Sequence, residues 1–305
     1  DLKVSVVGCG GRGTGAAVQA LRADENVELV AMADAFKDRL ENSLNAIKQE
    51  MEGEKNIDIK EKNKLTGFDG YKKAIDLADV VILATPPGFR PLHFKYAIEN
   101  DKHVFMEKPV ATDANGVRQV LETAKIANEK KLNVVVGLQR RYQYSYLNIL
   151  KQVRRGVVGK ITSGQVRWNG AGVWVRERKP NQTEMEYQMR NWYYFNWLCG
   201  DHIVEQHIHN IDVANWFLDE YPISAQGMGG REVRKGIDHG EIFDHHFVEF
   251  KYASGAIISS QCRHQPGTHR QVNEFLVGTK GKVDITNKNV INIEDHNGQI
   301  IHSYD

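Results

Sequence analysis

The sequence predicts an α/β protein with two domains, a doubly wound parallel sheet followed by an α+β domain with an antiparallel sheet. Three observations lead to this prediction. A length of 305 residues is long for one hydrophobic core. Apolar strands alternate with helical segments as far as residue 137, and strand-like runs separated by turns dominate after residue 222. We therefore expect one domain at 1–137 and another at 138–305.

The first domain is predicted from buried strands that alternate with helices. The predicted strands are 2–7, 27–33, 78–84, 102–106 and 133–137, and the predicted helices are 14–23, 93–100 and 113–130. The segment 37–64 is charged and helix-prone, so we place it on the surface. Because the strands are apolar along their length, they are typical of a parallel sheet that helices cover on both faces.

The pattern changes in the second domain. We expect helices at 146–155 and 201–218, a strand at 161–168, and further strands at 243–250, 256–261, 272–277, 282–285 and 290–293. Turn residues at 251–255 and 278–281 predict hairpins and therefore an antiparallel sheet. Because the last strands end abruptly at Asp305, we expect a further C-terminal element.

Composition argues against several classes of protein. A net charge of +1 gives no electrostatic attraction for nucleic acid or an anionic membrane surface. No apolar run approaches the ~20 residues of a membrane span. The three cysteines, Cys9, Cys199 and Cys262, form neither a disulfide framework nor a C-x-x-C metal pair. The chain opens on strand residues without a methionine, so loss of an export signal is an option and both cytoplasm and periplasm stay open as compartments.

A G-C-G-G-R-G turn follows the first strand and precedes the first helix. Gly8 permits the tight turn, Gly10 lets the backbone approach a pyrophosphate, and Gly13 permits close packing of helix on strand. The helix start offers free N–H groups to phosphates, and we count Gly11 and Arg12 among the cofactor-binding residues. This context predicts a dinucleotide-binding Rossmann domain.

Asp34 ends the second strand, where the dinucleotide fingerprint expects an acidic residue. Its carboxylate can accept hydrogen bonds from both ribose hydroxyls of an adenosine and would repel a 2′-phosphate. We therefore expect NAD rather than NADP, although Lys37 and Arg39 nearby weaken that preference. The simpler alternative is a glycine turn followed by an unrelated aspartate.

The tripeptide Glu107-Lys108-Pro109 ends a predicted parallel strand, at the edge where open α/β sheets bind ligands. A lysine there points toward the nicotinamide end of a bound dinucleotide. Its ammonium group can hold a substrate hydroxyl and stabilise negative charge on the oxygen. A lysine beside a proline turn is equally typical of a solvated surface.

One predicted helix of the second domain concentrates acidic residues and histidines. Glu205 and His209 share a face at spacing i, i+4, and Asp212 lies one turn further. A histidine beside carboxylates can take a proton near neutral pH, but His209 is also compatible with a core position. We interpret His202 and His207 as polar surface or packing residues. Metal binding is a further alternative, yet no signature such as H-E-x-x-H is present, and we predict no metal site.

These motifs, in this order, resemble the glucose–fructose oxidoreductase/inositol dehydrogenase (Gfo/Idh/MocA) family over nearly the whole chain. The resemblance rests on G-C-G-G-R-G, on the strand-end E-K-P and on an acid-x-x-x-His-x-x-Asp helix. It implies a Rossmann domain followed by an open-faced, mostly antiparallel sheet domain, with a sugar or polyol bound between them. The variant residues G-D-H, E-Q and H-N-I-D-V-A-N-W are similar to a subgroup common among glycan-degrading bacteria.

The resemblance also implies roles for individual residues. Lys108 matches the lysine that orients the reacting oxygen, and His209 matches the general base. Glu205 stands where most members carry aspartate, so its carboxylate is shifted by the length of a C–C bond; we assign it both catalytic and substrate-binding roles, and Asp212 a substrate-binding one.

Five further positions follow from the same resemblance. Thr85 and Pro86 match the cofactor-lining turn after the fourth strand, and Glu107 is expected beside the cofactor with Lys108. The segment 139–142 matches the crossover between domains, so Arg140 and Tyr142 are expected to face substrate.

Three functions are compatible with these residues. The first is an NAD-dependent oxidoreductase acting on a hydroxyl or keto group of a sugar, glycoside or cyclitol. The second is a glycoside hydrolase or lyase that retains NAD and works through transient oxidation at C3. The third is a dinucleotide-bound sugar sensor without catalysis, which would need neither Lys108 nor His209.

An open sheet face needs a cover, and large exposed apolar faces usually meet a partner. Alternating apolar positions in the C-terminal strands therefore predict a homodimer or homotetramer through this sheet: Phe243, Phe247, Val248, Ile257, Phe275 and Val277.

Overall fold

The computed structural model describes residues 1–51, 56–286 and 290–304. The chain forms two compact units. Unit 1 comprises residues 1–137 together with the short segment 197–200, and unit 2 comprises residues 138–196 and 201–305. Each unit is described by itself below. Among the described residues, no helix combines the length and apolar character needed to cross a membrane.

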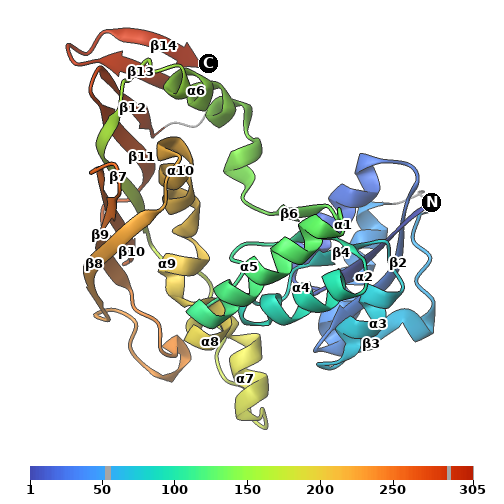
Figure 1. Ribbon diagram of the computed structural model, residues 1–305. Helices are drawn as coiled ribbons and strands as arrows, with labels where there is room; N and C mark the ends of the chain where they lie inside the picture. Colours follow the sequence, from blue (N-terminus) through green and yellow to red (C-terminus); the bar gives the residue numbers. More distant parts are fainter. Residues whose placement is uncertain (52–55, 287–289, 305) are drawn as a thin grey trace. The chain divides into compact units, whose positions relative to one another are not determined.

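Unit 1 is built on a six-stranded parallel sheet in the order β3-β2-β1-β4-β5-β6 (Figure 1). The strands are β1 (Leu2–Val7), β2 (Val27–Asp34), β3 (Lys64–Thr66), β4 (Val80–Leu83), β5 (His103–Met106) and β6 (Val134–Val136). This order is that of a doubly wound dinucleotide-binding sheet, so the predicted fold class is confirmed for unit 1. Strand β3 was not predicted, because three edge residues within a charged segment give no apolar run.

Helices cover both faces of this sheet. They are α1 (Gly11–Ala23), α2 (Lys37–Glu50), α3 (Gly70–Asp76), α4 (Arg90–Glu99) and α5 (Ala114–Glu129). Helices α1 and α2 contribute to one buried cluster, and α3, α4 and α5 contribute to another. The two clusters draw on opposite faces of the same strands, since neighbouring residues of a strand point in opposite directions.

Unit 2 contains an eight-stranded sheet in the order β14-β13-β12-β11-β7-β10-β9-β8. The strands are β7 (Ile161–Gly170), β8 (Pro222–Gly230), β9 (His245–Tyr252), β10 (Ile257–His264), β11 (Gln271–Gly278), β12 (Gly281–Ile285), β13 (Ile291–Asp295) and β14 (Ile300–Tyr304). All pairs are antiparallel except β7 with β10, which confirms a mostly antiparallel sheet. The two predicted hairpins join β9 to β10 and β11 to β12.

The helices α6 (Tyr144–Arg154) and α10 (Ile208–Leu218) lie along one face of this sheet and complete its core (Figure 1). Shorter helices are α7 (Glu184–Arg190), α8 (Asn196–Cys199) and α9 (Asp201–Glu205). The prediction of one continuous helix over 201–218 is wrong. The carbonyl of His202 accepts hydrogen bonds from the N–H groups of both Gln206, at 3.0 Å, and His207, at 3.1 Å. This widened turn separates α9 from α10, so Glu205 and His209 do not share one regular helical face.

Candidate active site

The glycine turn of unit 1 is shaped by close backbone contacts. Gly8 has φ +101°, and a Cβ there would lie 2.4 Å from the Thr85 nitrogen. A Cβ on Gly13 would lie 1.9 Å from the Gly8 carbonyl oxygen. By contrast, a Cβ on Gly10 or Gly11 would meet nothing within 4 Å. The start of α1 therefore opens on free space, as a bound pyrophosphate requires.

Asp34 lies beside this turn at the end of β2. One carboxylate oxygen accepts a hydrogen bond from the Cys9 N–H at 2.8 Å, and the other accepts from the Phe36 N–H at 2.9 Å. Burial raises the pKa of this carboxyl. Because each carboxylate oxygen can accept a second hydrogen bond, the group can still receive the two hydroxyls of a ribose.

Glu107 holds the start of α1 to the end of β5. Its Oε1 accepts from Arg12 Nε at 3.0 Å and from Arg12 Nη2 at 2.5 Å. A side chain on Gly137 would collide with Glu107, since a Cβ there would lie 2.7 Å from Oε2. Glu107, predicted at the cofactor, is thus fixed by protein partners, and it anchors the backbone that presents Lys108.

The turn that contains Thr85 and Pro86 is supported from beneath by Arg90, which is 1% exposed. Arg90 donates hydrogen bonds to the carbonyls of Leu83 at 2.6 Å and Thr85 at 2.7 Å. Burial lowers the pKa of Arg90 to about 10. Arg90 was not predicted from the sequence, because an arginine at the start of a helix that also carries His93, Lys95 and Glu99 gives no sign of burial.

His93 lies against the same turn and is 5% exposed. Its Nδ1 lies 3.3 Å from Thr85 Oγ1. Burial, helped by the charge of Arg90, lowers the pKa of His93 to about 3. The imidazole is therefore neutral and serves packing rather than proton transfer.

In unit 2, His209 projects from α10 toward the sheet and is 7% exposed. Its ring stacks on Trp168 of β7, with centroids 5.9 Å apart and planes 26° apart. The guanidinium of Arg140 lies 5.8 Å from the same indole. Stacking on the indole of Trp168 thus fixes the plane of the His209 ring.

Arg140 is 1% exposed and forms an ion pair with Glu274 of β11. Glu274 also accepts hydrogen bonds from Tyr146 Oη at 3.0 Å and from Asn210 Nδ2 at 2.6 Å. This buried network holds Asn210, the residue next to His209, in place. Because its charge is engaged inside the unit, Arg140 positions neighbouring side chains, and its contact with substrate stays a prediction.

Asp212 is occupied in a similar way. Its two oxygens accept parallel hydrogen bonds from Arg141, from Nε at 2.8 Å and Nη2 at 2.7 Å. The pair ties α10 to the 3₁₀ turn η3 (Gln139–Tyr142). Tyr142, in the same turn, is 62% exposed and stays a candidate for substrate contact.

A polar pocket of about 320 Å³ opens on unit 2, beside Trp168. Its lining is mostly amide and cationic side chains and backbone, and comprises Trp168, Asn169, Gly170, Ala171, Gly172, Gln206, His264, Arg270, Gln271 and Val272. None of these residues was predicted as a site residue. Four separate segments supply them (168–172, 206, 264 and 270–272), and only the fold brings those segments together.

The two histidines without an assigned role lie inside unit 2. His202 and His207 are both 0% exposed, so both lie in the interior of the unit and the surface alternative is wrong. His207 Nε2 lies 2.8 Å from Ser260 Oγ, and burial lowers the pKa of His207 to about 3. Its position follows from the widened turn between α9 and α10.

Comparison with protein families matches both parts of the chain. Residues 2–138 match the model of the oxidoreductase family with an NAD-binding Rossmann fold, Gfo/Idh/MocA. Residues 146–284 match the Gfo/Idh/MocA C-terminal domain. The predicted family and the predicted cofactor are therefore confirmed.

Curated relatives are similar at moderate identity. Inositol 2-dehydrogenase of Rhizobium meliloti is 25% identical over 278 residues, which cover 90% of this chain and 73% of that protein. The 2,7-anhydro-N-acetylneuraminate hydratase of Escherichia coli is 26% identical over 212 residues, which cover 68% of this chain and 52% of that protein. The chain therefore spans only about half the length of the second relative.

Solved structures share the fold. The WlbA dehydrogenase of Chromobacterium violaceum, determined with NADH and UDP-GlcNAcA, aligns with a TM-score of 0.74 at 23% identity over 97% of this chain and 78% of that one. A putative oxidoreductase from Thermotoga maritima aligns with a TM-score of 0.75 at 20% identity over 100% and 86%. With the glycine turn, Asp34 and the matched residues, these findings identify the chain as an NAD-dependent oxidoreductase of the Gfo/Idh/MocA family.

Proposed function

We propose that this oxidoreductase acts on a CH–OH group of a neutral sugar, glycoside or cyclitol, with His209 as general base. The observation that carries the proposal is the stacking of His209 on Trp168, which also lines the polar pocket of unit 2. NAD, when bound, supplies the hydride acceptor. The remaining steps belong to side chains of this chain.

His209 takes the hydroxyl proton at a ring nitrogen. Trp168 holds the ring plane, and the neighbouring Asn210 is fixed by its hydrogen bond to Glu274. A base whose ring cannot rotate keeps its lone pair on the reacting hydroxyl, which lowers the entropic cost of proton transfer. Lys108 orients the same oxygen and stabilises its developing negative charge.

The pocket lining supports the substrate class. Trp168 offers an aromatic face for the C–H side of a ring, while Gln206 and Gln271 offer amides for hydroxyl groups. Glu205, 9% exposed, adds a carboxylate at the end of α9. Inositol, the neutral cyclitol named for one relative, is in keeping with this lining.

The decisive experiment has two parts. One sample of purified protein is denatured and the released NAD(H) is measured. A native sample is then screened with sugars and cyclitols for NADH formation. His209→Asn should lower kcat by about 10²- to 10⁴-fold. It should leave the Kd for NAD unchanged, because NAD binds unit 1. Trp168→Ala should also lower kcat, whereas Trp174→Phe, in a separate aromatic group, should not. Full activity of His209→Asn would refute the assignment.

A redox-neutral reaction is the second candidate, because one relative is named a hydratase. In that case NAD stays bound and substrates react without added cofactor. Stoichiometric NAD in the purified protein, with glycoside turnover but no net NADH, would favour this reaction. A protein that binds the ligand without turning it over, and that loses this binding in Lys108→Ala, would instead be a sensor.

We also propose a homodimer or homotetramer through the uncovered sheet face. Met228 is 84% exposed, Phe247 45% and Ile257 44%. Cross-strand pairing places Met228 opposite Phe247, so the two share a face. Val248 points to the opposite face, since neighbouring strand residues alternate. A sedimentation coefficient of a monomer at micromolar concentration would contradict this proposal.

A further inference from the structure

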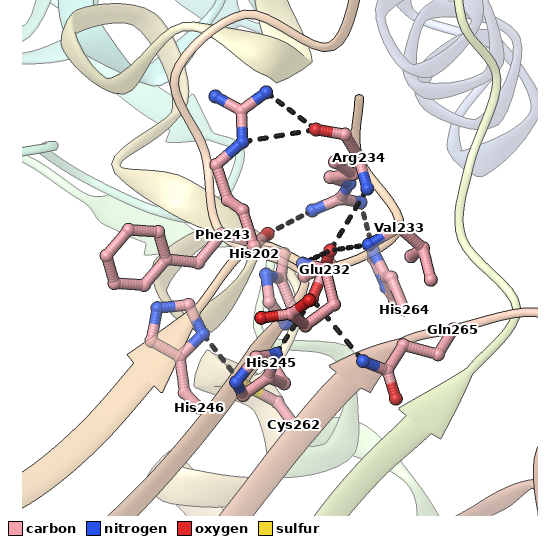
Figure 2. Close-up of polar contacts among 12 residues, drawn as sticks. His202, Glu232, Val233, Arg234, Phe243, His245, His246, Cys262, His264 and Gln265 are labelled. Carbon is pink, nitrogen blue, oxygen red and sulfur yellow. Dashed lines mark hydrogen bonds and ion pairs between the residues drawn. The ribbon is translucent and has the colours of Figure 1, made fainter. Parts of the chain in front are cut away.

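Three possible metal ligands meet inside unit 2. They are His202 of α9, His246 of β9 and Cys262 of β10, and their ligand atoms all lie within 4.8 Å of one another (Figure 2). His246 and Cys262 are direct cross-strand partners. His202 is 0% exposed and Cys262 is 1% exposed. The group is therefore enclosed by the fold.

Asp201 orients His202. Its Oδ1 accepts a hydrogen bond from His202 Nδ1 at 2.9 Å. In the neutral ring this leaves the lone pair on Nε2, and among the described residues nothing hydrogen-bonds to that buried atom. Asp201 Oδ2 also lies 3.6 Å from His246 Nε2, which is too long for a hydrogen bond, and His246 Nδ1 lies beside Cys262 Sγ. A carboxylate behind a ligating histidine is the usual second layer of a zinc site.

The distances suit a tetrahedral ion. His246 Nδ1 lies 3.7 Å from Cys262 Sγ. Bonds of ~2.3 Å to sulfur and ~2.0 Å to nitrogen at a tetrahedral angle place two such atoms about 3.5 Å apart. Closure of His202 toward these two atoms gives three protein ligands, and a water molecule would take the fourth tetrahedral position.

We propose that His202, His246 and Cys262 bind a zinc ion. Two imidazoles and a thiolate are the ligands of a borderline-soft divalent cation and not of magnesium or calcium. The charges balance, since a divalent ion with one thiolate and the Asp201 carboxylate sums to zero. Zinc binds the thiolate form of cysteine, so binding releases the Cys262 proton.

The neighbouring histidine is not part of the ligand set. Arg234 Nη2 donates to His264 Nδ1 at 2.6 Å, and His264 Nε2 donates to Gln206 Oε1 at 2.9 Å. Both ring nitrogens of His264 thus have partners. His202, with one buried nitrogen unsatisfied, differs from it in this respect.

The site has a structural consequence. It joins the five-residue helix α9 to two strands of the sheet. Gln206 follows directly after α9 and lines the polar pocket with His264. Zinc would therefore hold this side of the pocket in place.

The test titrates the metal-free chain with Co²⁺ as a spectroscopic probe and then with Zn²⁺. One equivalent of Co²⁺ should give a thiolate-to-cobalt charge-transfer band and intense tetrahedral ligand-field bands, and Zn²⁺ should abolish both. Cys262→Ser should lose the charge-transfer band. Asp201→Asn should bind about 10- to 100-fold more weakly. Two controls should give the Co²⁺ spectrum of the wild type. They are Cys9→Ser, which removes a buried thiol of unit 1, and His264→Gln.

Saturating Co²⁺ without a charge-transfer band in the wild-type chain would overturn the proposal, and this result needs no variant to fold. Equal Co²⁺ spectra for the wild type and Cys262→Ser would overturn it as well. Zn²⁺ should raise the Tm of the wild type and of Cys9→Ser but not that of Cys262→Ser, and this result would support the proposal. None of these measurements depends on NAD or on a substrate.

Discussion

Arg141 and Asp212 form a two-point ion pair in unit 2, with Nε to Oδ2 at 2.8 Å and Nη2 to Oδ1 at 2.7 Å. The Arg141 guanidinium also lies 5.0 Å from the centre of the Trp216 ring. The pair fixes α10 one turn after His209. Asp212 therefore positions the helix that presents the proposed base.

This geometry predicts a measurable coupling. Asp212→Asn and Arg141→Lys should each lower the free energy of unfolding by about 1–3 kcal/mol, because a paired charge-assisted hydrogen bond is lost. A double-mutant cycle followed by Trp fluorescence should give a coupling of at least about 1 kcal/mol. The exposed pair Lys282–Glu294 is the control and should couple by less than that. Equal coupling in both pairs would contradict the prediction.

The glycine turn predicts opposite effects for two neighbouring glycines of α1. Gly13→Ala should abolish NAD binding or folding of unit 1, because its Cβ would lie 1.9 Å from the Gly8 carbonyl oxygen. Gly15→Ala, whose Cβ meets nothing within 4 Å, should stabilise the helix by about 0.5–1 kcal/mol. Thermal unfolding and NAD titration measure both, and a tolerated Gly13→Ala would disprove the close contact.

Asp34 should set the choice of cofactor. Asp34→Asn should weaken NAD binding by at least about tenfold, which corresponds to about 1.4 kcal/mol. Because burial raises the pKa of Asp34, the affinity of the wild type should fall with decreasing pH before an ordinary aspartate would be protonated. Asp38→Asn, an exposed acid at the start of α2, is the control. Unchanged NAD affinity in Asp34→Asn would exclude the ribose contact.

His93 should make unit 1 sensitive to acid. Its pKa falls from 6.5 in the unfolded chain to about 3 in the fold, so only the unfolded chain takes up a proton between these values. This contribution to stability is complete above pH 6.5 and is lost as pH falls toward 3; the loss amounts to about 2 kcal/mol at pH 5. Urea unfolding of His93→Gln should depend less on pH than that of the wild type or the exposed His296→Gln. Parallel pH curves for all three would refute this.

The sequence predicted unit 1 well because its signals are local. Whole apolar strands and a glycine turn are visible within a few residues. Strand β8 was missed because its sequence, P-I-S-A-Q-G-M-G-G, combines proline, glycines and exposed positions at a sheet edge. The break between α9 and α10 was missed because a shared carbonyl leaves no trace in hydrophobic periodicity.

The candidate site was predicted in part for the same reason. Lys108 and His209 belong to short motifs, whereas Trp168 and Glu274 act through contacts between distant segments. Arg140 was expected to face substrate because segment 139–142 resembles the family's crossover between domains, and nothing near it in sequence identifies Glu274 as its partner. Burial of a charge becomes visible only when the partner strand is in place.

The ion pair between Arg140 and Glu274 has a consequence for biosynthesis, since the two residues are 134 positions apart. At roughly 5–20 residues per second, Arg140 leaves the ribosome on the order of ten seconds before its partner is made. During that interval β11 is absent, so α10 cannot pack against it and the Arg140 guanidinium near Trp168 lacks the Glu274 carboxylate. The proposed base is therefore organised only late in translation, so a nascent enzyme should stay catalytically silent until β11 has emerged.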